Sequence, residues 1–446
     1  MTHENDKINQ NLIELSEDVG SLWCGRIPIL ESPPSSFEFL RDYISPSRPC
    51  IIRNTIPPTS NNITSTAASK VDSESDSKKK DYLSLTLDDL VNLSDAFDNE
   101  LMLTVDVTPD GHGDTVRPVS ELSRDMEDHD KDPTSILHTQ QKWFVKPEQR
   151  YMSIRDFRSQ LRQSNYSENC NIDRLKESVC ITPVKHSELP PYPISTKGKM
   201  YVTTSNSKPQ TKKHPPVLYY SLQNNCLRTE CETLFSLKTP ENEHHPLFPK
   251  SFPFAEKAFD TGAPDAINLW IGNERSISSM HKDHYENLFY VLSGEKIFTI
   301  LPPADVPFLY ERSFPSGTFE HVKSKSKEKD EDDEEEDGYW HIVPDNESDE
   351  GDEYKVKWIE PDITDFESIH ENSDKSHSHP YPKLVNVHPK SVKVRAGEML
   401  YLPALWFHRV TQTCETVGIN YWYDMKFDSK WCYFNFLQHL ESHCVN

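Results

Sequence analysis

The chain has 446 residues, which is long enough for one large hydrophobic core or two ordinary ones. Hydrophobic residues make up 35% of it, the mean hydropathy is −0.72, and no stretch approaches the roughly 18 apolar residues that a membrane span requires. The net charge of −24 is mainly local, because the segment 330–353 holds 14 acidic residues and no Lys or Arg. We interpret the charge as the property of a solvated segment. We expect neither a nucleic acid nor a membrane as a partner.

Cysteine usage and the first residues indicate a reducing compartment. The nine cysteines are irregularly spaced and form no Cys-x-x-Cys motif, which argues against a disulfide framework and a zinc knuckle. Residues 1–20 are polar and charged and lack the apolar segment of a secretory signal. We therefore expect the protein in the cytoplasm, the nucleus or both.

The first part of the chain alternates between short structured runs and polar stretches. Residues 1–56 are predicted to support the core with a short helix, which begins after Ser35 or Ser36, and with a buried strand at 48–53. Residues 57–81 are rich in Ser, Thr, Asn and Lys and poor in apolar residues. This composition predicts a flexible insertion.

Residues 82–163 are predicted to form a second helical and strand region. It contains a helix at 85–93, a strand at 101–107 that ends in a Pro-Asp-Gly turn, and a helix-bearing segment at 144–163. Residues 164–215 are polar and rich in Pro, Lys and Ser. We predict a second insertion there.

Residues 216–425 carry the clearest β pattern and are predicted to be the core domain. Short β-branched and aromatic runs recur with turns between them, which is typical of an antiparallel barrel or sandwich; they lie at 217–222, 266–272, 280–283, 288–292, 296–301, 391–394, 399–403, 406–410 and 417–423. The acidic stretch 321–355 is predicted to be a disordered insertion in this domain. Residues 426–446 are predicted to form a C-terminal helix.

His281, Asp283 and the more distant His408 are the first indication of chemistry. In a strand, residues i and i+2 point to the same face, so His281 and Asp283 project into the predicted barrel while Lys282 and His284 face away. Two histidines and one carboxylate bind non-haem iron(II) and leave positions open for a co-substrate and dioxygen. His-x-Asp alone is a weak motif, and a core histidine bonded to its neighbour is the simpler interpretation.

Three further features favour a metal site over that simpler interpretation. Lys296 follows a glycine turn on the next strand and can point into the same lumen, where a buried ammonium group requires a negative partner such as a dicarboxylate. Residues 397–403 form a turn and an apolar strand that lead to His408 among bulky, water-excluding side chains. Asn287 and Asn420 lie beside these strands and offer amide groups to carboxylates. Each of these residues also has a simpler interpretation when it is considered alone. Lys296 could be a surface lysine, and Asn287 and Asn420 could be turn or edge residues.

Longer segments resemble the jumonji-C family. Four of them are similar to its metal-binding core: 278–288 (SSMHKDHYENL), 293–296 (SGEK), 395–408 (RAGEMLYLPALWFH) and 420–425 (NYWYDM). The similarity extends to N-terminal motifs at 33–35, 48–54 and 103–111. The similarity thus covers the chain apart from the insertions. On this basis the sequence most resembles the small jumonji-C group described as bifunctional peptidase and (3S)-lysyl hydroxylase.

The resemblance implies a mainly β fold with flanking helices, built on a double-stranded β-helix of the jelly-roll or cupin kind. It assigns iron(II) to His281, Asp283 and His408. It assigns 2-oxoglutarate, the co-substrate used with dioxygen, to Lys296, Ser278, Tyr219 and Asn287. The family commonly has threonine at the position of Ser278, which still provides a hydroxyl group.

The resemblance also implies hydroxylation of lysine in protein substrates, with translation-linked GTPases as partners. Asp110, Asp114 and Glu286 are candidates for holding the substrate ammonium group, although turn or surface roles are simpler for each. An N-methyl-lysine demethylase uses the same iron chemistry and is an alternative. A jumonji-type peptidase acting on histone or other protein tails and a non-catalytic cupin-like module are further alternatives. A homodimer is compatible with the sequence.

Overall fold

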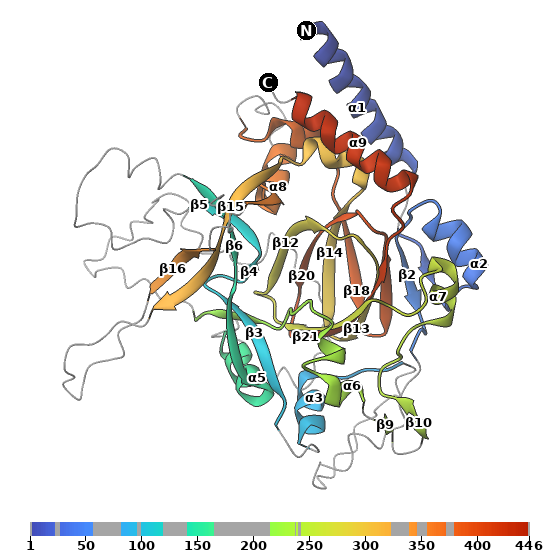
Figure 1. The fold of residues 1–446 in the computed structure, drawn as a ribbon, viewed down its shortest axis with the longest axis vertical. Helices are drawn as coiled ribbons and strands as arrows, with labels where there is room; N and C mark the ends of the chain where they lie inside the picture. Colours follow the sequence, from blue (N-terminus) through green and yellow to red (C-terminus); the bar gives the residue numbers. More distant parts are fainter. Residues whose placement is uncertain are drawn as a thin grey trace, which may run out of the picture.

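Two β-sheets face each other across an apolar core at the centre of the molecule (Figure 1). The computed structural model describes residues 2–22, 27–56, 82–95, 100–118, 141–164, 215–236, 238–239, 242–322, 339–345, 355–371 and 379–444. The predicted insertions at 57–81 and 164–215 therefore lie outside the described residues, except for Ser164 and Pro215. None of the helices in these ranges combines the length and the apolar character of a membrane span.

The first sheet has six strands and the second has five. The order in the first sheet is β1 (Ile29–Leu30), β2 (Cys50–Arg53), β19 (Glu398–Leu402), β13 (Tyr285–Ser293), β21 (Thr416–Asp424) and β11 (Ala266–Gly272). The order in the second sheet is β18 (Lys390–Arg395), β14 (Glu295–Leu301), β20 (Phe407–Gln412), β12 (Ile277–Lys282) and β4 (His112–Gly113). Consecutive strands from β11 to β14 and from β18 to β21 alternate between the sheets. This arrangement confirms the predicted jelly-roll core of a mainly β protein with flanking helices.

Two glycines form the turns at which the chain passes from one sheet to the other. Gly294 joins β13 to β14 with φ +79°, and Gly397 joins β18 to β19 with φ +88°. Glycine adopts this left-handed region without the steric cost that a Cβ atom imposes. Both turns lie where the sequence predicts them.

The first sheet is buried on both faces. In β19, Leu400 and Leu402 point into the core between the sheets, while Met399 and Tyr401 pack beneath a layer of helices. This double burial explains why the strand reads as a continuous apolar run without alternation. The helices of the layer are α2 (Ser36–Phe39), α3 (Leu87–Ser94), α5 (Ile154–Gln163), α6 (Glu232–Phe235) and α7 (Pro253–Phe259).

The first helix of that layer begins where the sequence predicts it. The Ser35 hydroxyl accepts a hydrogen bond from the Glu38 backbone N–H, and the Glu38 carboxylate accepts one from the Ser35 backbone N–H. This capping box satisfies two of the free N–H groups at the helix start. The helix continues as a π-helical turn, Leu40–Ile44, and Phe39 packs edge-on against Tyr401 with ring centroids 4.9 Å apart.

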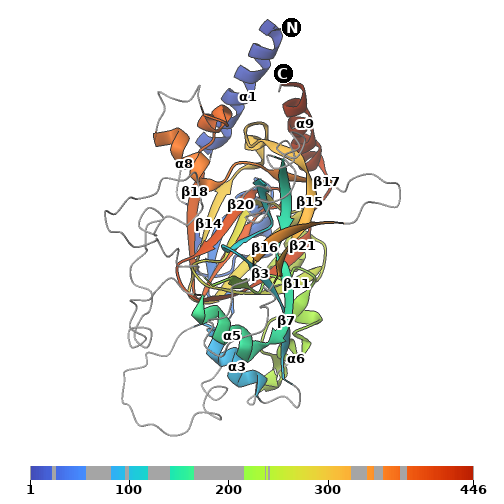
Figure 2. The same cartoon turned by 90° about the vertical axis from the view of Figure 1, so that its left-hand side faces the viewer.

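A second layer covers one end of the barrel, where both termini lie (Figure 2). It consists of α1 (Thr2–Leu22), η6 (Pro303–Phe308), α8 (Ile363–Glu371), η8 (Pro382–Asn386) and α9 (Ser429–Cys444). The helix α9 confirms the C-terminal helix predicted within 426–446, whereas α1 is an addition to the elements expected in 1–56. Leu12 of α1 is buried in the apolar cluster of this layer.

One buried carboxyl group joins α1 to this layer. Asp305 in η6 is 3% exposed and accepts a hydrogen bond from the Ser16 hydroxyl at 2.7 Å. Burial raises the pKa of Asp305 to about 7. The folded chain therefore keeps a proton that the unfolded chain releases at about pH 4. The stabilising contribution of this proton is fully present below about pH 4 and is lost as the pH rises through about 7.

We expect Asp305→Asn to remove this part of the pH dependence, because an amide does not titrate. Denaturant unfolding of both proteins across this pH range would show a free energy of unfolding that falls more steeply with pH in the wild type. Parallel pH profiles would contradict a protonated Asp305 in the folded state.

Strands beside the barrel add to one prediction and correct another. They are β3 (Met102–Thr108), β5 (Thr115–Pro118), β6 (Lys142–Lys146), β7 (Glu148–Ser153), β8 (Val217–Tyr219), β15 (Glu311–Val322), β16 (Tyr339–Pro344) and β17 (Lys355–Ile359). The segment 144–163, predicted as helix-bearing, contains α5 as predicted, and most of β6 and all of β7 precede this helix. The insertion 321–355, predicted as disordered, contains β16, which pairs with β15. The strand was not predicted because the surrounding residues are strongly acidic. Its Trp340 ring packs against Phe319 with ring centroids 6.0 Å apart.

The acidic run can be shortened at the ends of this hairpin. Val322 and Tyr339 are opposite each other in the β15–β16 pair, while residues 323–338 lie outside the described chain. We expect replacement of 323–338 by a two-residue turn to leave co-substrate turnover within about twofold. A deletion that also removes β16 should cost about 2 kcal/mol of unfolding free energy, because it uncovers the buried Phe319. Turnover and denaturant unfolding of both variants check this, and lost turnover in the first would contradict it.

Candidate metal centre

The pairing of two strands brings the predicted metal ligands together. His281 on β12 and His408 on β20 are opposite each other in the register, and their ring centroids are 4.2 Å apart. Asp283 follows the last residue of β12, and its backbone carbonyl accepts a hydrogen bond from the Leu405 N–H. Its carboxylate lies 3.5 Å from His408 Nε2 and 3.9 Å from His281 Nε2. The three candidate ligand atoms lie within 4.8 Å of one another.

Backbone carbonyls orient both imidazoles for metal binding. His281 Nδ1 lies 2.7 Å from the Ser279 carbonyl oxygen, and His408 Nδ1 lies 3.0 Å from that of Trp406. A protonated Nδ1 that donates to these carbonyls leaves the lone pair of each Nε2 directed at the centre. Burial, followed by the nearby His281, lowers the pKa of His408 to about 4. The ring is therefore neutral at physiological pH, as a metal ligand must be.

The donor set fits iron(II). Two imidazole nitrogens and one carboxylate on one side of the ion leave coordination positions open on the other side. His281, Asp283 and His408 line an inner cavity between the sheets, which could admit a co-substrate to a metal held there. Ser278, Tyr219, Lys296 and Asn287 line the same cavity, so the structure brings together every residue named for iron and 2-oxoglutarate.

Lys296 is a buried cation without a carboxylate partner in the described chain. Its side chain is fully buried, and Nζ donates hydrogen bonds of 2.9 Å to Tyr219 Oη and to Gln412 Oε1. The rings of Tyr219, Trp270 and Phe289 lie within 6.0 Å of Nζ. Burial lowers the pKa of Lys296 to about 7. An anion entering the cavity would supply the missing negative charge, which fits a dicarboxylate that also reaches the metal.

Hydroxyl and amide groups complete the polar lining. Burial raises the pKa of Tyr219, and a hydrogen bond with Ser278 partly offsets this effect. Asn287 Oδ1 accepts a hydrogen bond of 3.3 Å from Asn420 Nδ2, and Asn420 Oδ1 accepts one of 2.9 Å from Trp270 Nε1. These bonds orient the two amides that the sequence points to.

Residues 34–429 match the family model described as a cupin-like domain. The chain belongs to this cupin-like family. Proteins similar to this chain are largely JmjC proteins, and this confirms the jumonji-C resemblance of the metal-binding segments. JmjC cupins are generally iron(II)- and 2-oxoglutarate-dependent oxygenases, and the His-His-Asp site and Lys296 of this cupin-like chain fit that group.

Three relatives show how far the similarity extends. The JmjC domain-containing protein E of Dictyostelium discoideum is 29% identical over 412 residues, which is 91% of this chain and 86% of that protein. The bifunctional peptidase and (3S)-lysyl hydroxylase JMJD7 of Homo sapiens is 36% identical over 51% of this chain and 60% of its own length. The lysine-specific demethylase JMJ32 of Arabidopsis thaliana is 35% identical over 50% of this chain and 56% of its own length. The alignments with the last two therefore cover less than two thirds of those proteins.

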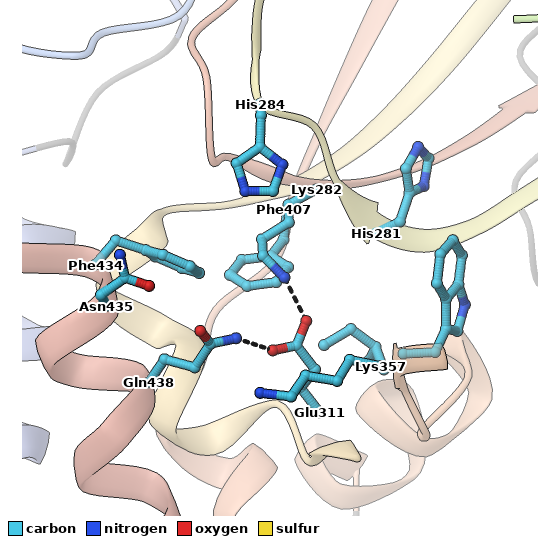
Figure 3. Close-up of a pocket in the computed structure, with 11 residues that line it drawn as sticks. His281, Lys282, His284, Glu311, Lys357, Phe407, Phe434, Asn435 and Gln438 are labelled. Carbon is cyan, nitrogen blue, oxygen red and sulfur yellow. Dashed lines mark hydrogen bonds and ion pairs between the residues drawn. The ribbon is translucent and has the colours of Figure 1, made fainter. Parts of the chain in front are cut away.

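A second cavity lies outside the barrel of the cupin-like chain (Figure 3). It is formed between β12, β17 and α9 and shares His281 with the inner cavity. Lys282 and His284 line it, so both side chains face away from the lumen, as predicted. Glu311 accepts hydrogen bonds from Lys282 and Gln438. Both oxygens of the Glu311 carboxylate in this outer cavity therefore accept a hydrogen bond.

The three candidate substrate residues differ in their surroundings. Asp110 is paired with Arg117 and lies 3.4 Å from His112 Nδ1, and these cations hold its pKa well below the usual range. Glu286 accepts hydrogen bonds from the Tyr401 hydroxyl and the Ala404 backbone N–H. The structure thus gives both of these carboxylates local structural partners. The carboxyl group of Asp114, by contrast, has no such partner among the described residues.

Sequence reasoning missed two residues of the centre. Gln412 is the second acceptor for Lys296, and it lies four residues after His408 on the same strand. The alternation of a strand places residues i and i+4 on one face, so this residue could have been found. Trp358 stacks on His281 at an interplanar angle of 4°. It comes from β17 after the acidic insertion, where no local pattern links it to the metal.

Proposed function

We propose that this chain is an iron(II)- and 2-oxoglutarate-dependent oxygenase that hydroxylates lysine side chains in protein substrates. The observation that carries the proposal is the His281, Asp283 and His408 triad in one cavity with the buried Lys296. The similarity to a human (3S)-lysyl hydroxylase supports lysine as the target. Translation-linked GTPases are the partners that the resemblance suggests.

Different residues of the chain have different roles in the proposed reaction. Iron(II) together with 2-oxoglutarate and dioxygen supplies the oxidising power when bound. His281, Asp283 and His408 would hold the metal at the wall of the inner cavity, which they line. Lys296, with Tyr219 beside it, receives the far carboxylate of 2-oxoglutarate.

Apolar side chains protect the proposed reaction from water. Trp270, Phe289, Phe298 and Val410 line the inner cavity and are each less than one tenth exposed. They keep the space around the metal dry, which suppresses side reactions of the oxidising species. No side chain acts as a general base in this proposal, because the hydrogen is taken from carbon.

Mass spectrometry of a protein substrate tests the proposal. Purified translation-linked GTPases are incubated with the full chain, iron(II), 2-oxoglutarate and ascorbate. A gain of one oxygen on lysine, absent when 2-oxoglutarate is omitted, is the expected result. Loss of methyl groups from methylated histone peptides or a cut polypeptide would instead favour a demethylase or a peptidase. The similarity to an Arabidopsis lysine-specific demethylase makes demethylation the second candidate.

We also propose a reducing compartment, the cytoplasm or the nucleus, as the location. Five cysteines in the described part of the chain are free thiols: Cys50, Cys226, Cys231, Cys414 and Cys432. Structural disulfides form mainly in oxidising compartments, so free thiols support this location. Fluorescence microscopy of the tagged chain checks it.

A further inference from the structure

Most carboxyl groups near the metal centre already have partners. Glu311 is bonded by Lys282 and Gln438, and Glu286 by Tyr401 and Ala404. Two more acids, Asp110 and Asp362, lie on either side of the buried His112, and Arg117 and Arg409 complete that cluster. Each of these carboxylates thus already has a hydrogen-bond or ion-pair partner.

Asp114 is held against the metal centre by its backbone. It follows β4, which runs parallel to β12 with Gly113 opposite Ser278. The Asp114 carbonyl oxygen accepts a hydrogen bond from the Ser279 hydroxyl, and the Ser279 carbonyl accepts from His281 Nδ1. Trp358 donates to the same Ser279 hydroxyl at 3.0 Å while its ring stacks on His281. These contacts fix Asp114 close to a metal ligand.

The carboxyl group of Asp114 has no hydrogen bond or ion pair with any residue that the structure describes, although the residue is partly buried. Burial, followed by the charge of Asp106, raises the pKa of Asp114 to about 6, while His281 and Lys146 act in the opposite direction. Lys146 is 44% exposed and lies 3.0 Å from Asp345, so it is already paired. The carboxyl group thus lies in a low-dielectric place without a cation of its own.

A second carboxyl group adds to this negative region. Asp106 on β3 is opposite Tyr219 on β8, so their side chains share one face beside the inner cavity. Asp106 is 8% exposed, and its hydrogen bonds come from two neutral groups, Ser221 and Gln149. The two acids therefore lie beside two residues that line the cavity, Asp106 beside Tyr219 and Asp114 beside His281.

We infer that Asp114, with Asp106 behind it, receives the protonated amine of the substrate side chain. This inference rests on the proposed function and names the group that selects its substrate. A partly buried carboxylate without a partner is costly, and an arriving ammonium group removes that cost by charge pairing and by three N–H donors. An ammonium group held by Asp114 would bring the methylene carbons of the same lysine within reach of the metal centre, because Asp114 lies beside His281.

Binding of a simple lysine derivative tests the inference without a known protein substrate. The full chain is loaded with Mn(II) and 2-oxoglutarate and titrated with Nα-acetyl-lysine methylamide, with the norleucine analogue as a neutral probe of similar shape. Paramagnetic relaxation of the probe protons by Mn(II) reports binding near the metal. We expect Asp114→Asn to raise the Kd of the lysine probe by about tenfold or more, as for a lost buried charge pair, and to change that of the norleucine probe by less than about twofold.

Two further variants separate recognition from structure. Asp114→Glu keeps the charge and should restore part of the lysine affinity, which a merely structural role would not do. Asp424→Asn removes one charge from an exposed position at the end of β21 and should leave both probes unaffected.

The outcomes distinguish this inference from the proposed function. Equal lysine affinity in the wild type and Asp114→Asn would overturn the inference, and so would a loaded wild-type protein that binds lysine no better than norleucine. The second comparison needs no variant and holds even if Asp114→Asn fails to fold. A wild-type chain that binds neither Mn(II) nor 2-oxoglutarate would refute the proposed function itself, and the inference with it.

Discussion

Replacing Asp283 with alanine is expected to abolish iron-dependent turnover while the chain remains folded. The Asp283 carboxylate lies close to Nε2 of both histidines, and its loss leaves only two neutral imidazoles for the metal. Removing even an outer partner of a metal ligand costs about 10–100-fold, so the loss of a direct ligand should exceed about 100-fold. Succinate release from 2-oxoglutarate and iron(II) binding measure the effect.

The fold of this variant should persist for a local reason. The side chain of Asp283 is 18% exposed, and the hydrogen bond from the Leu405 N–H goes to its backbone carbonyl, which alanine retains. A thermal melting curve within a few degrees of the wild type is expected. Asp424→Ala serves as a control, since it removes an exposed carboxylate from the end of β21. Succinate release that is preserved in Asp283→Ala would remove the metal assignment.

Two of the three metal ligands could be predicted from the sequence because local geometry determines them. His281 and Asp283 follow the two-residue period of a strand, and a β-branched and aromatic context marked that strand. The distant His408 was suggested by the apolar strand and bulky residues around it and by the family resemblance, because spacing alone does not link it to the other two ligands. Only the structure supplies the register that sets it opposite His281. The pairing of β12 with β20 depends on the fold of the whole barrel, so it cannot be predicted from any short stretch of the sequence.

Other elements were hidden by average composition. The acidic stretch 321–355 suggested disorder, yet its Trp340 and Ile342 belong to a strand whose partner β15 precedes the acidic run. In α1 a stripe of Ile8, Leu12, Leu15 and Val19 has helical spacing, but the surrounding residues are polar. The partner surface of that stripe, η6 and α9, is far away in the sequence. The helix was therefore not predicted, because its apolar stripe is surrounded by polar residues and is stabilised mainly by tertiary packing.

Lys296→Met is expected to weaken 2-oxoglutarate binding and to stabilise the ligand-free protein at the same time. Lys296 is fully buried, and its described partners are the neutral Tyr219 and Gln412. Without the anion it is a costly group, so an apolar side chain of similar length should raise the free energy of unfolding by on the order of 1 kcal/mol or more. When 2-oxoglutarate is bound, Lys296 pairs with its negative charge, so the loss of Lys296 should raise the Kd of 2-oxoglutarate at least about tenfold. Denaturant unfolding and titration of the Mn(II)-loaded protein measure the two effects.

The pH dependence of binding provides an independent check on the same group. Burial lowers the pKa of Lys296 to about 7 in the empty cavity, and a bound carboxylate favours the ammonium form and raises it. Below this pH the lysine is already charged and the affinity is at its maximum. Above it, a proton must be taken up on binding, so the Kd of 2-oxoglutarate should rise by up to about tenfold per pH unit. Lys296→Arg keeps its charge throughout this range and should not show the rise. A wild-type Kd that stays constant from about pH 6.5 to 8.5 would mean that Lys296 does not hold the far carboxylate.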